Sequence, residues 1–208
     1  MDRMYRFQRH FYDFTRKYYL LGRDRLLAEL DIWQSERVLE IGCGTGRNLI
    51  ILAKRYPEAH FYGLDASAAM LETAAAKIGN AKLTNVTLRT ALANSFSYSD
   101  PFALKVPFDK IFFSYSLSMI PVWRESIENA IENLKPSGEL LIVDFYDQKD
   151  LPIYFGNSVR WWLRQFHVKY PPELVPHLKN LQSAGNGGLT VTPLYRRYAF
   201  LTVFRKSP

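Results

Sequence analysis

A glycine-rich turn between a strand and a helix is the feature that most restricts the fold of this chain. The buried segment Arg37 to Ile41 (RVLEI) is followed by Gly42, Gly44 and Gly46, and a helix is expected to begin directly afterwards. Glycine permits positive φ and lets a ligand approach the backbone closely, while a helix N-terminus offers unpaired N–H groups. The pattern is typical of a turn that binds a nucleotide-like cofactor.

The spacing of these glycines argues against a dinucleotide. In the dinucleotide pattern G-x-G-x-x-G the third glycine would fall at position 47, where this chain has Arg47. The acidic Glu40 also stands two residues before the first glycine. A carboxylate there would meet a positive group or accept N–H bonds from the loop, and neither role suits a diphosphate. The turn therefore favours a cofactor without a pyrophosphate.

A second acidic residue ends the next expected strand. Asp65 closes the segment Phe61 to Asp65 (FYGLD) and lies 19 residues beyond Gly46. A carboxylate at this place can accept hydrogen bonds from both hydroxyls of a ribose. The alternative is that Asp65 caps the helix that starts near Ser67. Beside the glycine loop, the ribose role is the preferred interpretation.

Strands and helices alternate along the middle of the chain. Strands are expected at 37–41, 60–64, 86–90, 110–114 and 140–144, and helices at 48–56, 68–78 and 123–134. This alternation predicts an α/β fold with a parallel sheet and helices on both faces. Residues 189–197 and 198–205 are expected to form a terminal antiparallel pair at the sheet edge.

From Val38 to Phe145 the sequence resembles class I S-adenosylmethionine-dependent methyltransferases. The resemblance implies a Rossmann-like fold with a seven-stranded, mostly parallel sheet, in which the glycine loop holds the methionine part of the cofactor. It assigns the ribose to Asp65 and the adenine to Thr90–Asn94, although many members carry Asp where Leu92 stands here. The expected cofactor-binding residues are Arg23, Glu40, Gly42, Cys43, Gly44, Gly46, Asp65, Ala66, Leu92, Ala93 and Ser114.

Two further stretches, Arg9–Asp24 and Phe112–Pro121, are similar to the bacterial N-methyltransferases of betaine-lipid synthesis. That similarity implies successive methylation of the amine of diacylglyceryl-homoserine, and it names the enzyme that makes this lipid as a possible partner. The alternatives are a phosphatidylethanolamine or small-molecule amine methyltransferase, a nucleic-acid methyltransferase, and a non-catalytic cofactor-binding protein. The stretch Ser114–Leu117 lacks the Asp/Asn-Pro-Pro-Tyr pattern of enzymes that methylate nucleic-acid amino groups, so no nucleic acid is expected.

Methyl transfer to an amine needs alignment of the two reactants more than acid–base groups. The four histidines stand apart without the spacing of metal ligands, so no metal site is expected. Aromatic faces attract the cationic methylated amine. Tyr12, Tyr19 and Tyr115 are accordingly the candidate catalytic residues, with core packing as the alternative role for each.

An apolar stripe at helical spacing runs from Met4 to Leu21 and predicts an N-terminal helix that covers the cofactor, a membrane, or both. One domain over residues 1–208 is expected, with a helical cap at 1–35, a cofactor-binding core at 36–147, a substrate or lid insertion at 148–188 and a strand pair at 189–208.

The net charge of +7 favours anionic partners. Basic residues also lie beside aromatic ones in the first 25 residues and in 151–170. Together with a single cysteine and no apolar run long enough to span a bilayer, this predicts a cytoplasmic protein that contacts anionic membranes peripherally.

Overall fold

The computed structural model of the chain describes residues 20–152, 154 and 170–208. The candidate residues Tyr12 and Tyr19, and most of the aromatic and basic segment 151–170, lie outside these residues. Predictions that concern them stay predictions.

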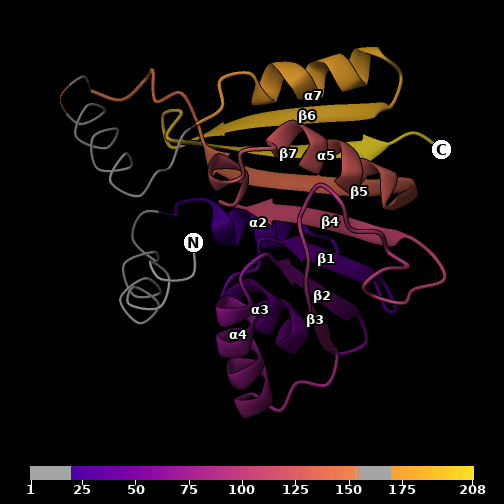
Figure 1. The fold of residues 1–208 in the computed structure, drawn as a ribbon. Coiled ribbons are helices and arrows are strands. Elements are labelled where there is room, and N and C mark those ends of the chain that lie inside the picture. Colours follow the sequence, from indigo (N-terminus) through magenta and orange to yellow (C-terminus); the bar gives the residue numbers. More distant parts are fainter. Residues whose placement is uncertain (1–19, 153, 155–169) are drawn as a thin grey trace.

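Seven strands form one sheet in the order β3-β2-β1-β4-β5-β7-β6 (Figure 1). The strands are β1 (Arg37–Ile41), β2 (His60–Asp65), β3 (Val86–Thr90), β4 (Phe108–Ser114), β5 (Leu134–Phe145), β6 (Gly187–Leu194) and β7 (Ala199–Lys206). Pairs among the first five strands are parallel, whereas β7 runs antiparallel to both β5 and β6. The expected α/β fold, with a mostly parallel sheet and one antiparallel strand, is confirmed.

Helices cover both faces of this sheet. They are α2 (Arg23–Glu29), α3 (Arg47–Arg55), α4 (Ala68–Asn80), the short 3-10 helix η1 (Leu117–Met119), α5 (Trp123–Glu132) and α7 (Leu174–Ser183). Successive residues of a strand face opposite sides, so Val38 packs with α2 and α3 while Leu39 packs with α5 and α7. The two resulting cores are both fully enclosed, and together they fix the strand ends where a ligand can bind.

Two sequence expectations need correction. Helix α7 lies in a region where no helix was expected, and Leu174, Val175 and Leu178 are its buried residues. The segment 195–197 was expected to be strand, but all three residues have φ between 50° and 59° and form the β6–β7 turn. Three left-handed residues cannot continue a strand, and no glycine announced that turn. The apolar residues of α7 do have helical spacing, but Pro171, Pro172 and Pro176 indicated a break there.

Ion pairs hold the amino ends of the strands together. The Asp109 carboxylate accepts the Arg37 backbone N–H at 2.8 Å and pairs with Lys135, while the Lys110 ammonium donates to Glu139 at 2.9 Å. Burial alone would raise the pKa of Asp109, but the hydrogen bonds and charges of Lys135 and Arg37 lower it. In the same way Arg205 and Lys110 lower the pKa of Glu139 against the effect of burial.

Candidate active site

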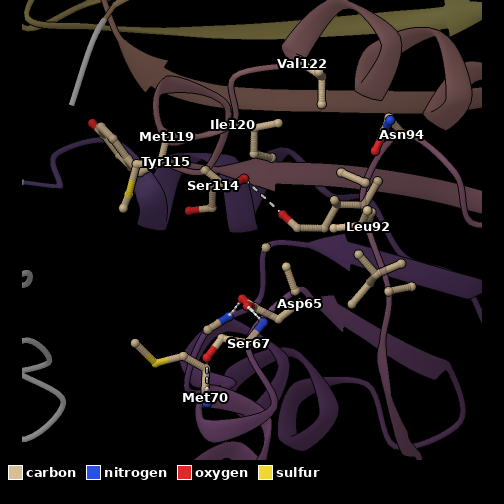
Figure 2. A pocket seen from close by; sticks show the side chains of 18 of the residues that line it. Asp65, Ser67, Met70, Leu92, Asn94, Ser114, Tyr115, Met119, Ile120 and Val122 are labelled. Atoms are coloured by element: carbon tan, nitrogen blue, oxygen red, sulfur yellow. Dashed lines mark hydrogen bonds between the residues drawn. The ribbon is translucent and has the colours of Figure 1, made fainter. Parts of the chain in front are cut away.

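The opposite edge of the sheet contains a pocket of about 290 Å³ at the carboxyl ends of β1, β2 and β4 and in the loop after β3. Its lining residues come from four loops: Ile41, Gly42, Gly44, Leu64, Asp65, Ala66, Ser67, Met70, Ala91, Leu92, Ala93, Asn94, Ser114, Tyr115, Ser116, Met119, Ile120, Pro121 and Val122. In Figure 2, Leu92 and Asn94 lie at one end of the pocket, Tyr115 and Met119 at the other, and Asp65 between them. The pocket is therefore elongated, with different chemistry at its two ends.

The glycine loop has the conformation that its sequence predicted. Gly42, Gly44 and Gly46 all have positive φ, at 73°, 54° and 74°. A Cβ added to Gly42 would lie 2.5 Å from the Cβ of Ser116, in the neighbouring loop after β4. Any side chain at position 42 would collide with Ser116 and strain the backbone, so this glycine lets the two loops pack closely at the side of the pocket.

Asp65 links the two loops that form the floor. Its Oδ2 accepts the Gly44 backbone N–H at 2.8 Å, and its Oδ1 accepts the Ser67 N–H at 2.9 Å, as drawn in Figure 2. Ser67 in turn caps α4 by accepting the Met70 N–H. The contact with the Ser67 N–H agrees with the alternative prediction that Asp65 caps the start of helix α4. Asp65 also lines the pocket, where a carboxylate oxygen has further lone pairs to accept ribose hydroxyls.

Three of the expected cofactor residues support the loop from beneath and do not line the pocket. Glu40 is buried on β1, where its Oε1 accepts the Asn48 side-chain N–H of α3 at 2.7 Å. The Cys43 thiol is buried against Gly63, and burial raises its pKa well above the ordinary value, so it stays protonated. Gly46 is the N-cap of α3.

Tyr115 lines the pocket from the turn after β4, with φ of 56°. Its hydroxyl donates to the Leu21 carbonyl, and its ring packs edge-on against Phe145 at 4.7 Å. Burial, followed by the negative charge of Asp144, raises the pKa of this phenol well above its ordinary value. Arg23 is buried on α2 and is not among the lining residues, although its charge acts on Tyr115.

The other expected positions line the pocket: Ala66, Leu92, Ala93 and Ser114. The sequence did not single out Met119–Val122, which form the upper wall, although they adjoin the stretch 112–121 that carried the narrower resemblance. Only the similarity of the stretch 112–121 to a known family pointed to these residues, because no spacing rule identifies an apolar loop as part of a cofactor pocket.

A family model described as a methyltransferase domain matches residues 33–186 of the chain. The chain belongs to this methyltransferase family. The matched range includes the glycine loop, Asp65 and the β4–α5 loop, so the methyltransferase domain contains the described pocket. Residues 33–186 thus form the domain of an S-adenosylmethionine-dependent methyltransferase.

Curated relatives of this methyltransferase have different substrates. A trans-aconitate 2-methyltransferase from Deinococcus radiodurans is 34% identical over 106 residues, which are 51% of this chain and 36% of that protein. A demethylmenaquinone methyltransferase from Listeria welshimeri is 28% identical over 129 residues, or 62% of this chain and 52% of the relative. The matches thus span about half the length of these relatives or less.

Solved structures of methyltransferases share the fold. An S-adenosylmethionine-dependent methyltransferase from Aquifex aeolicus has a TM-score of 0.64 at 20% identity and covers 92% of this chain and 93% of its own. Phosphoethanolamine N-methyltransferase 2 from Haemonchus contortus, in complex with phosphomonomethylethanolamine and S-adenosylhomocysteine, has a TM-score of 0.70 at 16% identity. It covers 90% of this chain and 53% of its own.

The residues of the pocket fit S-adenosylmethionine. Gly42 and Gly44 line the pocket without side chains, and Asp65 beside them carries a carboxylate that could accept the hydroxyls of a ribose. The cofactor supplies an electrophilic methyl group on a sulfonium. Asp65 would hold the ribose of this cofactor, and Tyr115 and Met119, which line the pocket at the end away from Leu92, would exclude water by apolar contact.

Among residues 20–152, 154 and 170–208, no group of His, Cys, Asp and Glu side chains could hold a metal ion. The same residues include no helix that is long and apolar enough to cross a membrane.

Proposed function

We propose that this methyltransferase transfers methyl groups to the amine of a lipid, most specifically diacylglyceryl-homoserine, to give the trimethylated betaine lipid. The observation that carries the proposal is the aromatic side of the pocket at Tyr115, in the stretch 112–121 whose sequence is similar to betaine-lipid N-methyltransferases. An aromatic ring attracts an amine that becomes cationic as it is methylated. The ring of Phe145 packs against Tyr115 and holds it in place.

The chemistry of the site is compatible with an amine nucleophile. The Tyr115 hydroxyl donates to a carbonyl, and the pKa of this phenol is raised, so it does not act as a base near neutral pH. An amine needs no base at the moment of transfer, because its lone pair is free once its own proton has left. Activity should therefore rise with pH toward the pKa of the substrate amine.

The proposed substrate requires access to a membrane surface. The net charge of +7 and the basic and aromatic stretches 1–25 and 151–170 support peripheral contact with anionic lipid. The purified protein should bind anionic vesicles more tightly than neutral ones, and salt should weaken this binding. Equal binding to both kinds of vesicle would remove the electrostatic part of the proposal.

Methylation of a small carboxylate is the second candidate, favoured by the trans-aconitate 2-methyltransferases among the relatives. A carboxylate is also a nucleophile that needs no base. The two candidates differ in what must accompany the reacting group, since a polycarboxylate needs cationic partners and a lipid amine needs an apolar and aromatic approach.

The test is a comparison of substrates with one protein preparation. Lipids from a bacterial host that expresses this chain together with the enzyme that makes diacylglyceryl-homoserine should contain mono-, di- and trimethylated species by mass spectrometry. The matched control is Asp65→Ala, which should abolish these species while the protein is still produced. In vitro, transfer to trans-aconitate without transfer to the lipid amine would overturn the proposal in favour of the second candidate. Transfer to phosphatidylethanolamine alone would overturn the homoserine head group.

A further inference from the structure

The β4–α5 loop, which forms the upper wall of the cofactor pocket, is held from two sides. On one side the Ser116 hydroxyl donates to the Ile41 carbonyl at 2.9 Å, and the Ser116 Cβ lies against Gly42. Ser116 thus ties the loop to the glycine turn below it. The opposite tie is made by β5, from a residue that does not line the pocket.

That residue is Asp144, whose side chain is fully buried near the end of β5. Its Oδ2 accepts the Ser118 backbone N–H at 3.0 Å, and its Oδ1 accepts the N–H of the next residue, Phe145, at 2.8 Å. The Ser118 hydroxyl and the Leu117 backbone N–H also lie close enough to this carboxylate to lower its pKa. The start of η1 therefore directs the Ser118 backbone N–H at one buried carboxylate.

This arrangement caps η1 from outside the helix. The first N–H groups of a helical turn have no partner within the turn, and a carboxylate satisfies them more strongly than a neutral acceptor does. The residues that follow, Met119–Val122, line the pocket directly, and Figure 2 shows Met119, Ile120 and Val122 across from Asp65. The position of the Asp144 carboxylate therefore determines the position of Met119–Val122 in the pocket.

We propose that Asp144 is a positioning residue for the cofactor, which acts by holding η1 and the Met119–Val122 wall in the binding geometry. Asp144 itself contacts neither cofactor nor substrate. Its ionised form makes the stronger cap, so the wall is best ordered when the carboxylate is charged.

The Asp144 carboxylate should change its protonation state near pH 6. Complete burial raises the pKa of Asp144 to about 6, against the opposing effect of the donors on Ser118, Phe145 and Leu117. Tyr115, after β4, is the phenol whose pKa Asp144 affects, and Tyr195, Tyr198 and Arg23 act on that phenol in turn. Phenols and guanidinium groups do not titrate near pH 6, so among these described groups only Asp144 changes its charge in this range.

Two consequences can be measured with cofactor binding alone, and the result does not depend on which substrate the enzyme uses. Affinity for S-adenosylhomocysteine should fall as the pH drops below about 6, because the weaker cap belongs to the protonated acid. By linkage, binding at pH 6 should release protons from the protein.

The experiment is calorimetry of S-adenosylhomocysteine binding from pH 5 to 8, in buffers of different ionisation enthalpy, with wild type and Asp144→Asn. Asn keeps the shape but cannot be ionised, so the variant should bind about tenfold more weakly at pH 7.5. It should also lose the fall in affinity below pH 6 and the proton release. Ser118→Ala, which removes only a hydroxyl that lowers the pKa of Asp144 and leaves the carboxylate and its backbone donor, should show a smaller loss and keep the fall in affinity at low pH.

The matched control is Thr202→Val, because the Thr202 hydroxyl is buried on β7 without a hydrogen-bond partner. This change should leave both affinity and pH profile as in wild type. Asp144→Asn with wild-type affinity and an unchanged pH profile would overturn the proposal. If Asp144→Asn does not fold, the wild-type protein decides it: no proton release on binding at pH 6 would reject the role.

Discussion

The amino ends and the carboxyl ends of the strands, here called the amino edge and the carboxyl edge of the sheet, differ in how their carboxylates are paired. At the amino ends of the strands, Asp109 and Glu139 face cations that lower the pKa of each carboxyl. At the carboxyl ends, Asp65 and Asp144 accept backbone N–H groups, and burial raises the pKa of Asp144 to about 6. Side-chain cations lower the pKa of Asp109 and Glu139, whereas Asp65 and Asp144 are hydrogen-bonded to backbone N–H groups.

This difference indicates that the carboxylates at the amino ends of the strands mainly stabilise the sheet, whereas those at the carboxyl ends mainly shape the cofactor pocket. Side-chain ion pairs join strands to one another, so they stabilise the sheet whether or not a ligand is bound. Loop N–H groups held by a carboxylate instead fix the shape of a cavity, at a desolvation cost that the fold tolerates only where the shape is used. Changes at the carboxyl edge should therefore alter cofactor binding, and changes at the amino edge should alter stability.

The largest effect is expected for Gly42→Ala, at the carboxyl edge. The added Cβ would lie 2.5 Å from the Ser116 Cβ, at a φ of 73° that itself costs a side chain about 1–2 kcal/mol. Affinity for S-adenosylhomocysteine by calorimetry should fall roughly a hundredfold or more.

The double variant Gly42→Ala/Ser116→Gly should recover part of this loss, because it removes the atom that clashes. Gly79→Ala is the matched control, since a Cβ on Gly79 of α4 meets nothing within 4 Å. No recovery in the double variant would show that backbone strain alone is responsible.

The next effect is expected for Asp65→Ala. This change removes the acceptor for Gly44 and Ser67 together with the acceptor for the cofactor ribose. Hydrogen bonds to a charged group are worth about 1.5–3 kcal/mol, so cofactor affinity should fall roughly 10- to 150-fold. The cofactor affinity of Asp65→Asn, which keeps one acceptor oxygen, should lie between those of wild type and Asp65→Ala. Unchanged affinity in Asp65→Ala would leave this residue as a cap of α4 only.

At the amino edge, Asp109→Asn should lower stability without changing cofactor affinity. The buried carboxylate pairs with Arg37 and Lys135, and its loss leaves both donors with a weaker partner. Urea unfolding should show a loss of about 1–2 kcal/mol, while calorimetry of the folded variant matches wild type. A large loss of cofactor affinity would contradict the separation of the two edges.

The smallest effect is a difference in pH dependence between two substitutions. The lowered pKa of Asp109 means that its contribution to stability is present at neutral pH and is lost as the pH falls below about 4. The raised pKa of Asp144 has the opposite sign: its contribution is present at low pH and is lost as the pH rises through about 6. From pH 7.5 to 4.5, the stability of wild type should therefore rise relative to Asp144→Asn, but not relative to Asp109→Asn. Equal slopes would contradict the opposite signs.

How far the sequence predicted the molecule also differs between the two halves of the sheet. The glycine loop, Asp65 and the strand–helix alternation are local patterns, and each could be assigned from residues that stand close together in the chain. Position 144 could only be assigned to a strand, because its partners on η1 lie 26 residues away and no spacing rule joins them. Helix α7 was missed for a different reason: Leu174, Val175 and Leu178 have helical spacing, but the prolines in and before this segment indicated a break.

The β6–β7 turn has a consequence for the order in which the sheet assembles. Strand β6 pairs with β7 alone, and only four residues, Tyr195–Tyr198, connect the two. A hairpin with so short a connection forms within microseconds, whereas β7 must find β5 across more than 50 residues of chain. We therefore expect the hairpin to form before β7 pairs with β5, so that the docking of β6 and β7 onto the five parallel strands is a late step. In a refolding experiment, protection of the amides of β5 that face β7 should appear after protection within the hairpin itself.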